Sequence, residues 1–378
     1  MSQLPARPMA NSNVARVLIV DDSAIIRGLV TRWIEAEPNL KLAGVAVNGR
    51  DGVKLAGETQ PDVIILDIEM PEMNGLEALP ALLKAAPKAR VLMSSTLTRR
   101  GAEITMKALT LGAADYITKP ETGAAAAADF QRDLIAKAIA LGRRFQPSSS
   151  SAASSGVRLA PPNPSGTPAA RPGPSAPPSH LRAPMAVDIL VIGSSTGGPQ
   201  ALRSLLPELT GKLRQPILIA QHMPAMFTTI LAQHLSQATK KDVQEAKDGA
   251  PINPGCIYVA PGDFHMRISK RHGAPRIELD QSPPVNFCRP AVDPLFLSAC
   301  DAYGPNVLAV VLTGMGSDGK RGAETIVAKG GAVLAQDEAT SVVWGMPGAV
   351  AHANLAYGIH ALKDLAPAIA QLAQGRRN

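Results

Sequence analysis

The sequence predicts an α/β protein with two doubly wound parallel-sheet domains, joined by a disordered segment rich in Pro and Ser. First, a chain of 378 residues is longer than one ordinary hydrophobic core requires. Second, 46% of the residues are hydrophobic but only 3% are aromatic, which favours aliphatic layers of helix on sheet. Third, short apolar runs alternate with stretches of helical spacing on both sides of the Pro- and Ser-rich segment.

The first domain is expected at residues 15–145, after a disordered N-terminus of residues 1–14. It contains five apolar runs typical of buried strands, and the amphipathic stretches between them predict a parallel sheet. The runs are Val17–Val20, Leu42–Val47, Val63–Leu66, Val91–Met93 and Tyr116–Ile117. The carboxyl ends of these strands should meet at one edge, where α/β proteins place their functional groups.

The linker is expected at residues 146–184, which contain ten Pro and nine Ser. Such a stretch cannot bury enough apolar surface to offset the entropy of ordering it. We therefore expect a flexible tether; a docking segment for another protein is the alternative.

The second domain is expected at residues 185–378 and repeats the alternation of strand and helix. Its strand candidates are Ile189–Ile192, Ile217–Ala220, Ile257–Val259, Val307–Leu312, Val333–Ala335 and, less clearly bounded, Leu355–Gly358. Six such runs predict a second and larger parallel sheet.

Composition excludes several classes of function. The formal net charge of +7 is spread as +2, +3 and +2 over the first domain, the linker and the second domain, so no basic surface for nucleic acid is expected. Cys256, Cys288 and Cys300 lack the close spacing of a zinc site or a disulfide framework and indicate reduced thiols. Neither a signal peptide nor an apolar stretch of about 18 residues is present. We expect a cytoplasmic protein without membrane insertion.

Acidic residues follow the strands of the first domain. Asp21 and Asp22 come after the first strand, Asp67 after the third, Ser95 after the fourth and Lys119 after the fifth. Carboxylates that converge repel each other, and a hard divalent cation such as Mg²⁺ relieves that repulsion. Asp67 beside Mg²⁺ can attack a phosphoryl group, Lys119 can pair with the new phosphate, and the Ser95 hydroxyl can donate a hydrogen bond to it. Plain helix caps are the alternative.

These residues resemble the motifs of response-regulator receiver domains. The resemblance covers residues 15–144 and rests on Asp21-Asp22, the run Val63–Pro71 and Thr118-Lys119-Pro120. It implies a flavodoxin-like fold and a histidine kinase as the phosphodonor of Asp67.

The same resemblance implies roles for individual residues. Mg²⁺ would be held by Asp22, Asp67 and the backbone carbonyl of Glu69, with Asp21 beside them. The residues that would sense the phosphate are Ser95, Lys119 and Tyr116.

The second domain contains one candidate nucleophile, in the segment Gly193–Gly198 between a strand and a helix. A dinucleotide-binding fingerprint is disfavoured because Ser195 replaces its middle glycine, and a Walker loop is excluded because Pro199 follows instead of Lys. The segment fits G-x-S-x-G, which presents Ser195 next to amides at a helix N-terminus. A glycine-rich turn with a capping serine stays open.

A serine nucleophile requires a base and an orienting acid from other strand ends. His222 directly follows an apolar run and is the best base, with His265 in reserve. Asp318 follows another run and is the best acid, whereas Asp263 and Asp337 are the alternatives. Glycines at 314, 316 and 319 leave amides free to face a developing oxyanion.

The order Ser195, His222, Asp318 differs from the serine, acid, histidine order of common α/β hydrolases. Residues 186–375 instead resemble the catalytic domain of chemotaxis protein-glutamate methylesterases, a Rossmann-like α/β domain. The segments that carry the resemblance are Gly193–Gly198, Gln221–Pro224, Tyr258–Gly262 and Leu312–Gly319.

By this resemblance Ser195, His222 and Asp318 form a catalytic triad, Thr196 lies beside it, and the Met315 amide contributes to the oxyanion site. No cofactor is implied for this domain. The implied substrates are methylated glutamates of methyl-accepting chemotaxis receptors, with glutamine deamidation as a second activity. One departure is Phe287-Cys288 where the family usually has a histidine before Arg-Pro, which leaves the role of that loop open.

The expected function is therefore a phosphorylation-activated serine hydrolase for chemotaxis adaptation. The receiver would cover the serine until Asp67 is phosphorylated. Two alternatives are a response regulator whose second domain only binds a partner or nucleotide, and a DNA-binding response regulator. A fluorophosphonate probe would separate the first, since it labels only an activated serine. The second would need a compact helix-turn-helix instead of about 190 residues of strand-helix alternation.

Overall fold

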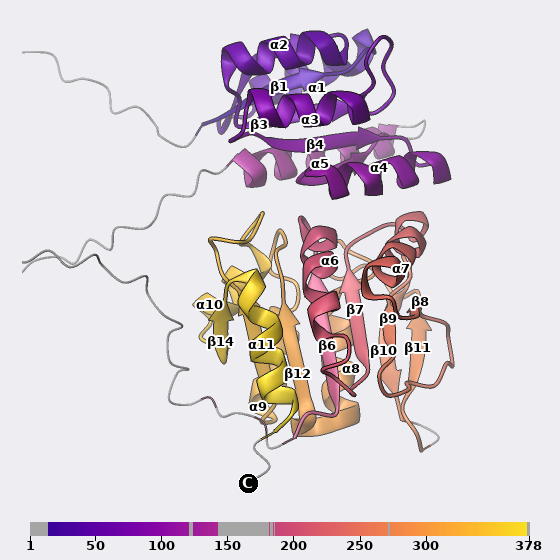
Figure 1. Cartoon of the computed structure of the whole chain (residues 1–378). Coiled ribbons are helices and arrows are strands. Elements are labelled where there is room, and N and C mark those ends of the chain that lie inside the picture. The colour runs from indigo at the N-terminus through magenta and orange to yellow at the C-terminus, as the bar shows by residue number, and fades with distance from the viewer. Residues whose placement is uncertain are drawn as a thin grey trace, which may run out of the picture.

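A computed structural model describes residues 14–120, 124–142, 181, 184, 186–270 and 273–375. They form two α/β units, which are separate in the chain and in contact in space (Figure 1). The expected disordered N-terminus and the expected linker lie outside the described residues, apart from Val14, Leu181 and Pro184. No helix in the described ranges is long and apolar enough to cross a membrane.

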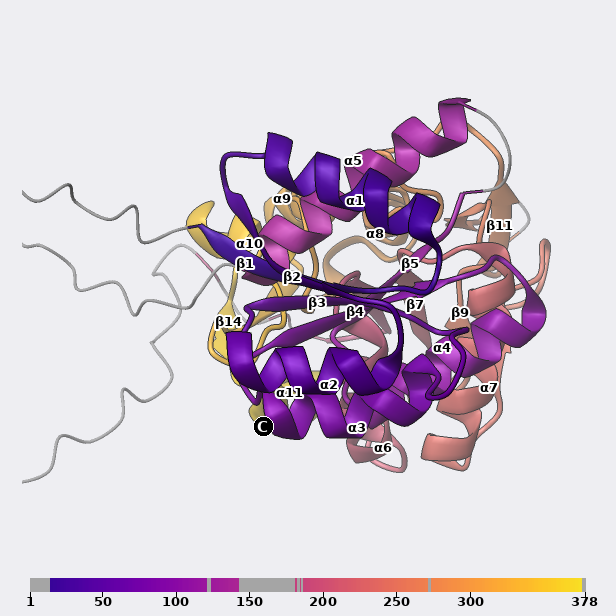
Figure 2. The same cartoon turned by 90° about the horizontal axis from the view of Figure 1, so that it is seen from above.

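The first unit is a five-stranded parallel sheet with the order β2-β1-β3-β4-β5. Its strands are β1 (Ala15–Val20), β2 (Leu40–Ala46), β3 (Val63–Asp67), β4 (Arg90–Ser95) and β5 (Asp115–Thr118). Its helices are α1 (Ala24–Ala36), α2 (Gly49–Thr59), α3 (Gly75–Ala85), α4 (Arg99–Leu111) and α5 (Ala124–Gly142). Figure 2 shows α1 and α5 on one face of the sheet and α2, α3 and α4 on the other.

The local sequence explains where these helices begin. The side chains of Ser23, Asn48 and Thr98 each accept a hydrogen bond from the first turn of the following helix. Asn74 and Glu77 form a reciprocal capping box at the start of α3. Each cap ends the preceding loop, so the residues just after the strands are held at one edge of the sheet.

The second unit is a seven-stranded parallel sheet with the order β14-β13-β12-β6-β7-β9-β8, together with an antiparallel hairpin of β10 and β11. Its strands are β6 (Ile189–Ser194), β7 (Ile217–Gln221), β8 (Val243–Glu245), β9 (Ile257–Val259), β10 (His265–Ser269), β11 (Arg276–Asp280), β12 (Val307–Val311), β13 (Ala332–Gln336) and β14 (Gly358–His360). Its helices are α6 (Gly198–Leu209), α7 (Ala225–Thr239), α8 (Val292–Tyr303), α9 (Lys320–Ala328), α10 (Met346–His352) and α11 (Leu362–Ala373), with a 3₁₀ turn at Gly304–Asn306.

Apolar side chains of α6, α7 and α11 cover one face of this sheet, and those of α8, α9 and α10 cover the other. The chain leaves β6 toward β7 but leaves β12 toward β13, on the opposite side. Loops that diverge in this way open a crevice at the carboxyl ends of the strands, where α/β proteins bind ligands.

The predicted fold class is confirmed, with two doubly wound parallel sheets. One strand boundary was misplaced: Leu355–Gly358 was the less clearly bounded candidate, and β14, Gly358–His360, shares only Gly358 with it. The amide of Leu355 instead donates to the carbonyl of Val350 at 3.1 Å and closes the end of α10. The apolar character of this stretch therefore reflects packing of a helix end. The strand candidates also omitted the three-residue strand β8 and the two strands of the β10–β11 hairpin.

The two units contact each other through α4, β5 and α5 of the first and the carboxyl edge of the second (Figure 1). Buried apolar residues of α4 and α7 belong to one continuous cluster. The ring of Tyr116 stacks on that of Phe227, with centroids 4.5 Å apart and planes 9° apart. The edge of the second sheet is therefore partly covered.

Candidate active site and phosphoacceptor pocket

The acidic pocket of the first unit lies at the carboxyl ends of β1 and β3. Carboxylate oxygens of Asp21, Asp22 and Asp67 all lie within 4.8 Å of one another. Asp21 and Asp67 are buried, whereas Asp22 is exposed. Carboxylate oxygens are the ligands that Mg²⁺ prefers, and three of them with one open to solvent fit such a cation.

Lys119 balances part of this negative charge. Its ammonium lies 2.8 Å from Oδ1 of Asp67 and 3.1 Å from Oδ2 of Asp21. Burial nevertheless raises the pKa of the Asp67 carboxyl to about 6, because Lys119 offsets only part of that effect. The carboxyl group that would become phosphorylated therefore lies in an environment that disfavours its negative charge. A bound cation such as Mg²⁺ would remove this effect.

The other expected phosphate-sensing residues do not contact Asp67 in this arrangement. The Ser95 hydroxyl donates to the carbonyl of Thr96 at 3.3 Å. The Tyr116 ring is only 6% exposed and is engaged by Phe227 of the second unit. Glu69 lies in the loop between β3 and α3. Ser95 and Tyr116 would therefore have to leave these contacts in order to reach a phosphate on Asp67.

The turn that carries Ser195 depends on two glycines. Gly197 has a φ of 78°, and a Cβ there would lie 2.5 Å from Val342. A Cβ on Gly198 would lie 2.0 Å from Oε1 of Gln221. Only glycine fits both positions, so the chain turns sharply from β6 into α6 and holds Ser195 at the positive end of that helix.

Strand register places Ser195 beside His222. Ser194 pairs with Gln221 in neighbouring parallel strands, and the His222 amide donates to the Ser194 carbonyl at 3.1 Å. Neighbouring strands lie about 4.8 Å apart. Ser195 follows Ser194 and His222 follows Gln221, so Ser195 and His222 are neighbours at the ends of adjacent strands. The Gln221 side chain adds a hydrogen bond of 3.0 Å to the Ser195 carbonyl. Within the described part of the chain, the Ser195 hydroxyl makes no hydrogen bond.

Asp318 is joined to His222 by a hydrogen bond of 2.7 Å between Oδ2 and Nε2. The carboxylate is 1% exposed and also accepts the backbone amides of Val292 at 2.6 Å, Asp293 at 3.1 Å and Gly319 at 2.9 Å. The side-chain amide of Asn286 donates to it as well, at 3.1 Å. A buried carboxylate with this many donors stays ionised and fixed in orientation.

The electrostatics of the pair favour charge on both groups. Burial lowers the pKa of the His222 imidazole, but hydrogen bonds to Asp318 and then to Cys288 outweigh it and raise the pKa to about 10. Burial raises the pKa of Asp318, but the hydrogen bond and the charge of His222, together with the backbone donors Val292 and Asp293, outweigh it and hold the pKa below its ordinary value. In this covered state the imidazole is therefore held as imidazolium at neutral pH.

Two backbone amides near Ser195 are free, among the described residues, to receive an oxyanion. Neither the Thr196 nor the Met315 amide donates a hydrogen bond to any described residue. A Cβ on Gly314 would lie 2.8 Å from the Cβ of Ser195, so this loop packs directly on the serine. The Thr313 hydroxyl donates to the Thr196 carbonyl at 2.8 Å and fixes one loop against the other. Such preorganised donors suit a tetrahedral intermediate.

The alternative site residues are engaged elsewhere. Both ring nitrogens of His265 meet backbone groups, the carbonyl of Pro283 and the amide of Ala291, each at 3.2 Å. Asp263 has a φ of 65° in a turn. Asp337 accepts the amide of Thr340 at 3.0 Å. These contacts give His265 and Asp337 local structural roles, and Asp263 is a turn residue.

Two contacts near the serine were not foreseen from the sequence. Sγ of Cys288 lies 3.3 Å from Nδ1 of His222. The Thr196 hydroxyl donates to Oδ2 of Asp115, in β5 of the first unit, at 2.7 Å. Neither pair has a characteristic spacing, since Cys288 is 66 residues from His222 and Thr196 is 81 residues from Asp115. Only the departure at Cys288 from the family pattern offered a signal.

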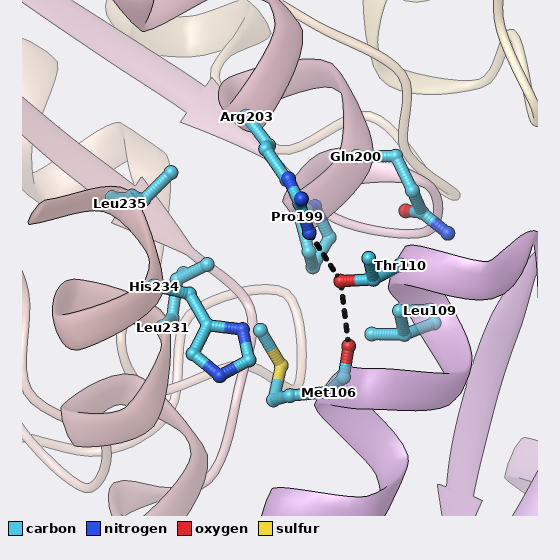
Figure 3. Close-up of a pocket in the computed structure, with 9 residues that line it drawn as sticks. All are labelled: Met106, Leu109, Thr110, Pro199, Gln200, Arg203, Leu231, His234 and Leu235. Carbon is cyan, nitrogen blue, oxygen red and sulfur yellow. Dashed lines mark hydrogen bonds between the residues drawn. The ribbon is translucent and has the colours of Figure 1, made fainter. Parts of the chain in front are cut away.

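A small pocket lies between the two units, where α4 faces α6 and α7 (Figure 3). It is lined by Met106, Leu109, Thr110, Pro199, Gln200, Arg203, Leu231, His234 and Leu235. Arg203 donates to the Thr110 hydroxyl at 2.5 Å across the interface. The contact between the units therefore combines apolar packing with a few polar bonds.

Comparison with known proteins finds two family matches. Residues 17–128 match the response regulator receiver domain, and residues 190–369 match the family described as CheB methylesterase. A protein-glutamate methylesterase/protein-glutamine glutaminase of Maricaulis maris is 49% identical over 99% of this chain and 100% of that protein. A second such protein, from Caulobacter vibrioides, is 51% identical over 95% of this chain and 99% of that protein.

Two solved structures from Thermotoga maritima each match one unit. The CheB methylesterase catalytic domain is 40% identical, covers 50% of this chain and 99% of that chain, and has a TM-score of 0.48. The response regulator domain of CheB is 43% identical, covers 33% of this chain and 93% of that chain, and has a TM-score of 0.31.

Proposed function

The chain belongs to the protein-glutamate methylesterase/protein-glutamine glutaminase family, and on that premise we propose which residues carry out and control its reaction. It is a phosphorylation-activated serine hydrolase of chemotaxis adaptation, as predicted. The observation that supports Ser195, His222 and Asp318 as its triad is the 2.7 Å bond from Asp318 to a histidine at the strand end beside Ser195.

The reaction begins at Ser195. Because Asp318 occupies Nε2 of His222, the other ring nitrogen, Nδ1, takes the serine proton. The serine oxygen attacks the carbonyl carbon of a glutamyl methyl ester, and the amides of Thr196 and Met315 stabilise the oxyanion. His222 then protonates the leaving methoxide, and methanol departs from the acyl-enzyme.

Water completes the cycle. His222 takes a proton from water, the hydroxide attacks the acyl carbon, and the proton returns to the Ser195 oxygen as the receptor glutamate leaves. A receptor glutamine follows the same course with ammonia as the leaving group. The ionised Asp318 stabilises the imidazolium at both stages.

Phosphorylation of Asp67 controls access to this site. The donor would be a histidine kinase, and the residues that would hold Mg²⁺ are Asp22, Asp67 and the Glu69 carbonyl, with Asp21 beside them. When bound, Mg²⁺ neutralises charge on the transferring phosphoryl group. Lys119 then pairs with the phosphoryl oxygens instead of the bare carboxylate.

The phosphate signal passes through β5. Ser95 and Tyr116 turn toward the phosphate, which removes Tyr116 from Phe227 and loosens the bond of Asp115 to Thr196. The receiver then uncovers Ser195. What supports this course is that β5 lies next to both the phosphate pocket and the serine turn.

The remaining assignments complete the proposal. Residues 15–145 are the receiver, 185–378 the esterase domain, and 146–184 the linker that permits their rearrangement. The substrates are methyl-accepting chemotaxis receptors, met in the cytoplasm, a compartment consistent with three free thiols. Nucleic acid takes no part.

The test is methanol release from methylated receptor membranes, with Mg²⁺ and with or without acetyl phosphate. The wild type should release methanol faster with acetyl phosphate. Ser195→Ala should release none while its circular dichroism spectrum stays unchanged, and a fluorophosphonate probe should label the wild type at Ser195 only. Undiminished release by Ser195→Ala would overturn the assignment.

A further inference from the structure

The loop of residues 283–290 is not used by the mechanism above, although it ends beside the catalytic base. We propose that Cys288 in this loop is a positioning residue for His222, whose thiol engages Nδ1, the nitrogen that must accept the Ser195 proton. The inference rests on the proposed function and adds a further residue that governs its base.

The two nitrogens of His222 have different partners. Nε2 meets Asp318 at 2.7 Å and Nδ1 meets Sγ of Cys288 at 3.3 Å. Hydrogen bonds that involve sulfur are longer than those between nitrogen and oxygen, so the 3.3 Å separation of Sγ and Nδ1 is a hydrogen-bond distance. Both nitrogens are thus engaged, while the Ser195 hydroxyl has no partner in the described ranges. For Ser195 to lose its proton, Cys288 has to yield Nδ1.

The backbone of the loop gives an independent reason to assign it a role. Val285 and Cys288 exchange two backbone hydrogen bonds of 3.1 and 2.9 Å. Between them, Asn286 and Phe287 have φ values of 53° and 63°, as in a type I′ turn. Asn tolerates this left-handed region, but a bulky Phe does not, so the turn is strained at Phe287.

Burial of Phe287 does not relieve that strain. The side chain is 90% exposed, and the guanidinium of Arg132 lies 5.7 Å from its ring centroid. The contacts that hold the turn come from its other residues: Asn286 donates to Asp318 at 3.1 Å, and Cys288 meets His222. A strained turn fixed by both members of the acid-base pair indicates that its role is to position them.

The titratable groups around His222 define what the thiol does. Asp318 and Cys288 face the imidazole directly, and Asp293 lies behind Asn286, at 3.4 Å from its side-chain amide. Burial lowers the pKa of His222, whereas both Asp318 and Cys288 raise it. Loss of Cys288 therefore lowers the pKa of the base and leaves more of it in the neutral form that can take the Ser195 proton.

The experiment compares full-length Cys288→Ala, Cys288→Ser and wild type, all with Mg²⁺ and acetyl phosphate. Methanol release from methylated receptor membranes is measured from pH 5.5 to about 10.5, so that the range includes the pKa of His222. Cys288→Ala should move the acidic limb of kcat/KM to lower pH by about one unit, because one partner of the imidazole is lost. KM should stay the same. Cys288→Ser, which retains a hydrogen-bonding oxygen, should restore most of the limb toward its wild-type position.

Cys256→Ala is the matched control. Cys256 is also half-buried but precedes β9, at the amino end of that strand and away from the site. The acidic limb of its kcat/KM profile should coincide with that of the wild type. A Cys288→Ala limb that also coincides with the wild type would overturn the inference. If the wild type releases no methanol, the proposed function fails instead, so the two failures are distinct.

A second measurement needs no variant at residue 288. In Cys256→Ala protein, methyl methanethiosulfonate forms an S–S bond to Cys288, the thiol loses its proton, and methanesulfinate leaves. Cys300 is 1% exposed and should stay unmodified. The added methylthio group fills the space at Nδ1, so methanol release should fall at least tenfold and return with dithiothreitol. Full activity of protein shown by mass spectrometry to be modified at Cys288 would overturn the proposal.

Discussion

Asp318 illustrates how much of this site depends on single residues. It collects three backbone amides, one side-chain amide and the imidazole of His222 while almost wholly buried. The carboxylate thus joins the start of α8, the loop of Asn286 and the base into one unit. A residue with so many donors both orients the imidazole and holds the loops around it.

We expect Asp318→Asn to lower kcat at least a hundredfold, because a neutral amide cannot stabilise the imidazolium of His222. The variant loses acceptors for buried amides as well, which costs about 1–3 kcal/mol of stability. Methanol release and urea unfolding measure the two effects. A kcat within a few-fold of the wild type would exclude Asp318 as the orienting acid.

A second prediction at this scale concerns Asp67. Its pKa is raised to about 6 in the folded chain, above its ordinary value of 3.8. Ionisation of Asp67 therefore costs folding stability above pH 6, and the cost vanishes below about pH 4, where the folded and unfolded states are both protonated. We expect Asp67→Asn to stabilise the Mg²⁺-free receiver by about 1–3 kcal/mol at pH 7.5.

Calorimetry of the full chain at pH 7.5 and pH 3.8 provides the measurement. The gain in Tm should be present at the higher pH and nearly absent at the lower pH. Asp129→Asn, an exposed carboxylate on α5, is the control and should change Tm little at either pH. Equal gains at both pH values would contradict the electrostatic explanation.

At the scale of elements, β5 connects the phosphate pocket to the serine turn. This four-residue strand carries Asp115, which binds the Thr196 hydroxyl, and Tyr116, which stacks on Phe227. Lys119 follows its end directly and lies 2.8 Å from Asp67. A small shift of one edge strand can therefore change contacts in both units.

We expect Asp115→Ala to raise methanol release by the unphosphorylated chain about tenfold, because a charge-assisted hydrogen bond across the interface contributes about 1–2 kcal/mol. Release by the chain treated with acetyl phosphate should stay near the wild-type level, since the proposed uncovering of Ser195 would already break this bond. Asp129→Ala serves as the control on the adjacent helix. Unchanged release by unphosphorylated Asp115→Ala would show that this bond does not restrain the esterase.

At the scale of the whole molecule, two sheets meet with their functional edges close together. The face of α4, β5 and α5 lies over the carboxyl edge of the second sheet, and the apolar cluster runs from α4 into α7 (Figures 1 and 2). Contact surfaces of this kind between domains favour relative movement, because they are neither large cores nor wholly polar. The proposed function requires that phosphorylation weaken this contact.

We expect Mg²⁺ with acetyl phosphate to increase the radius of gyration of the wild type in solution scattering, because the receiver leaves the esterase edge. Asp67→Asn cannot form the phosphoaspartate and should keep its original radius under the same conditions. Activation of methanol release without any change in scattering would indicate a local rearrangement instead of domain separation.

Much of the fold followed from the sequence because buried parallel strands require apolar runs, and helices between them require a longer period. Ten of the eleven strand candidates lie largely within observed strands, and the functional residues were expected at strand ends for the same reason. The exception, Leu355–Gly358, shows the limit: burial makes a helix end as apolar as a strand. Short strands such as Val243–Glu245 carry too few residues for any period to show.

The sequence by itself determined the two folding units, the acidic pocket and the three residues offered as nucleophile, base and acid. Each is encoded locally, by a strand and the few residues after it. Only the tertiary structure decided that Cys288 occupies Nδ1 of His222, that Asp115 binds Thr196 and that Tyr116 rests on Phe227. These contacts join segments far apart in the chain, and their geometry depends on how loops and whole sheets pack, which no local spacing records.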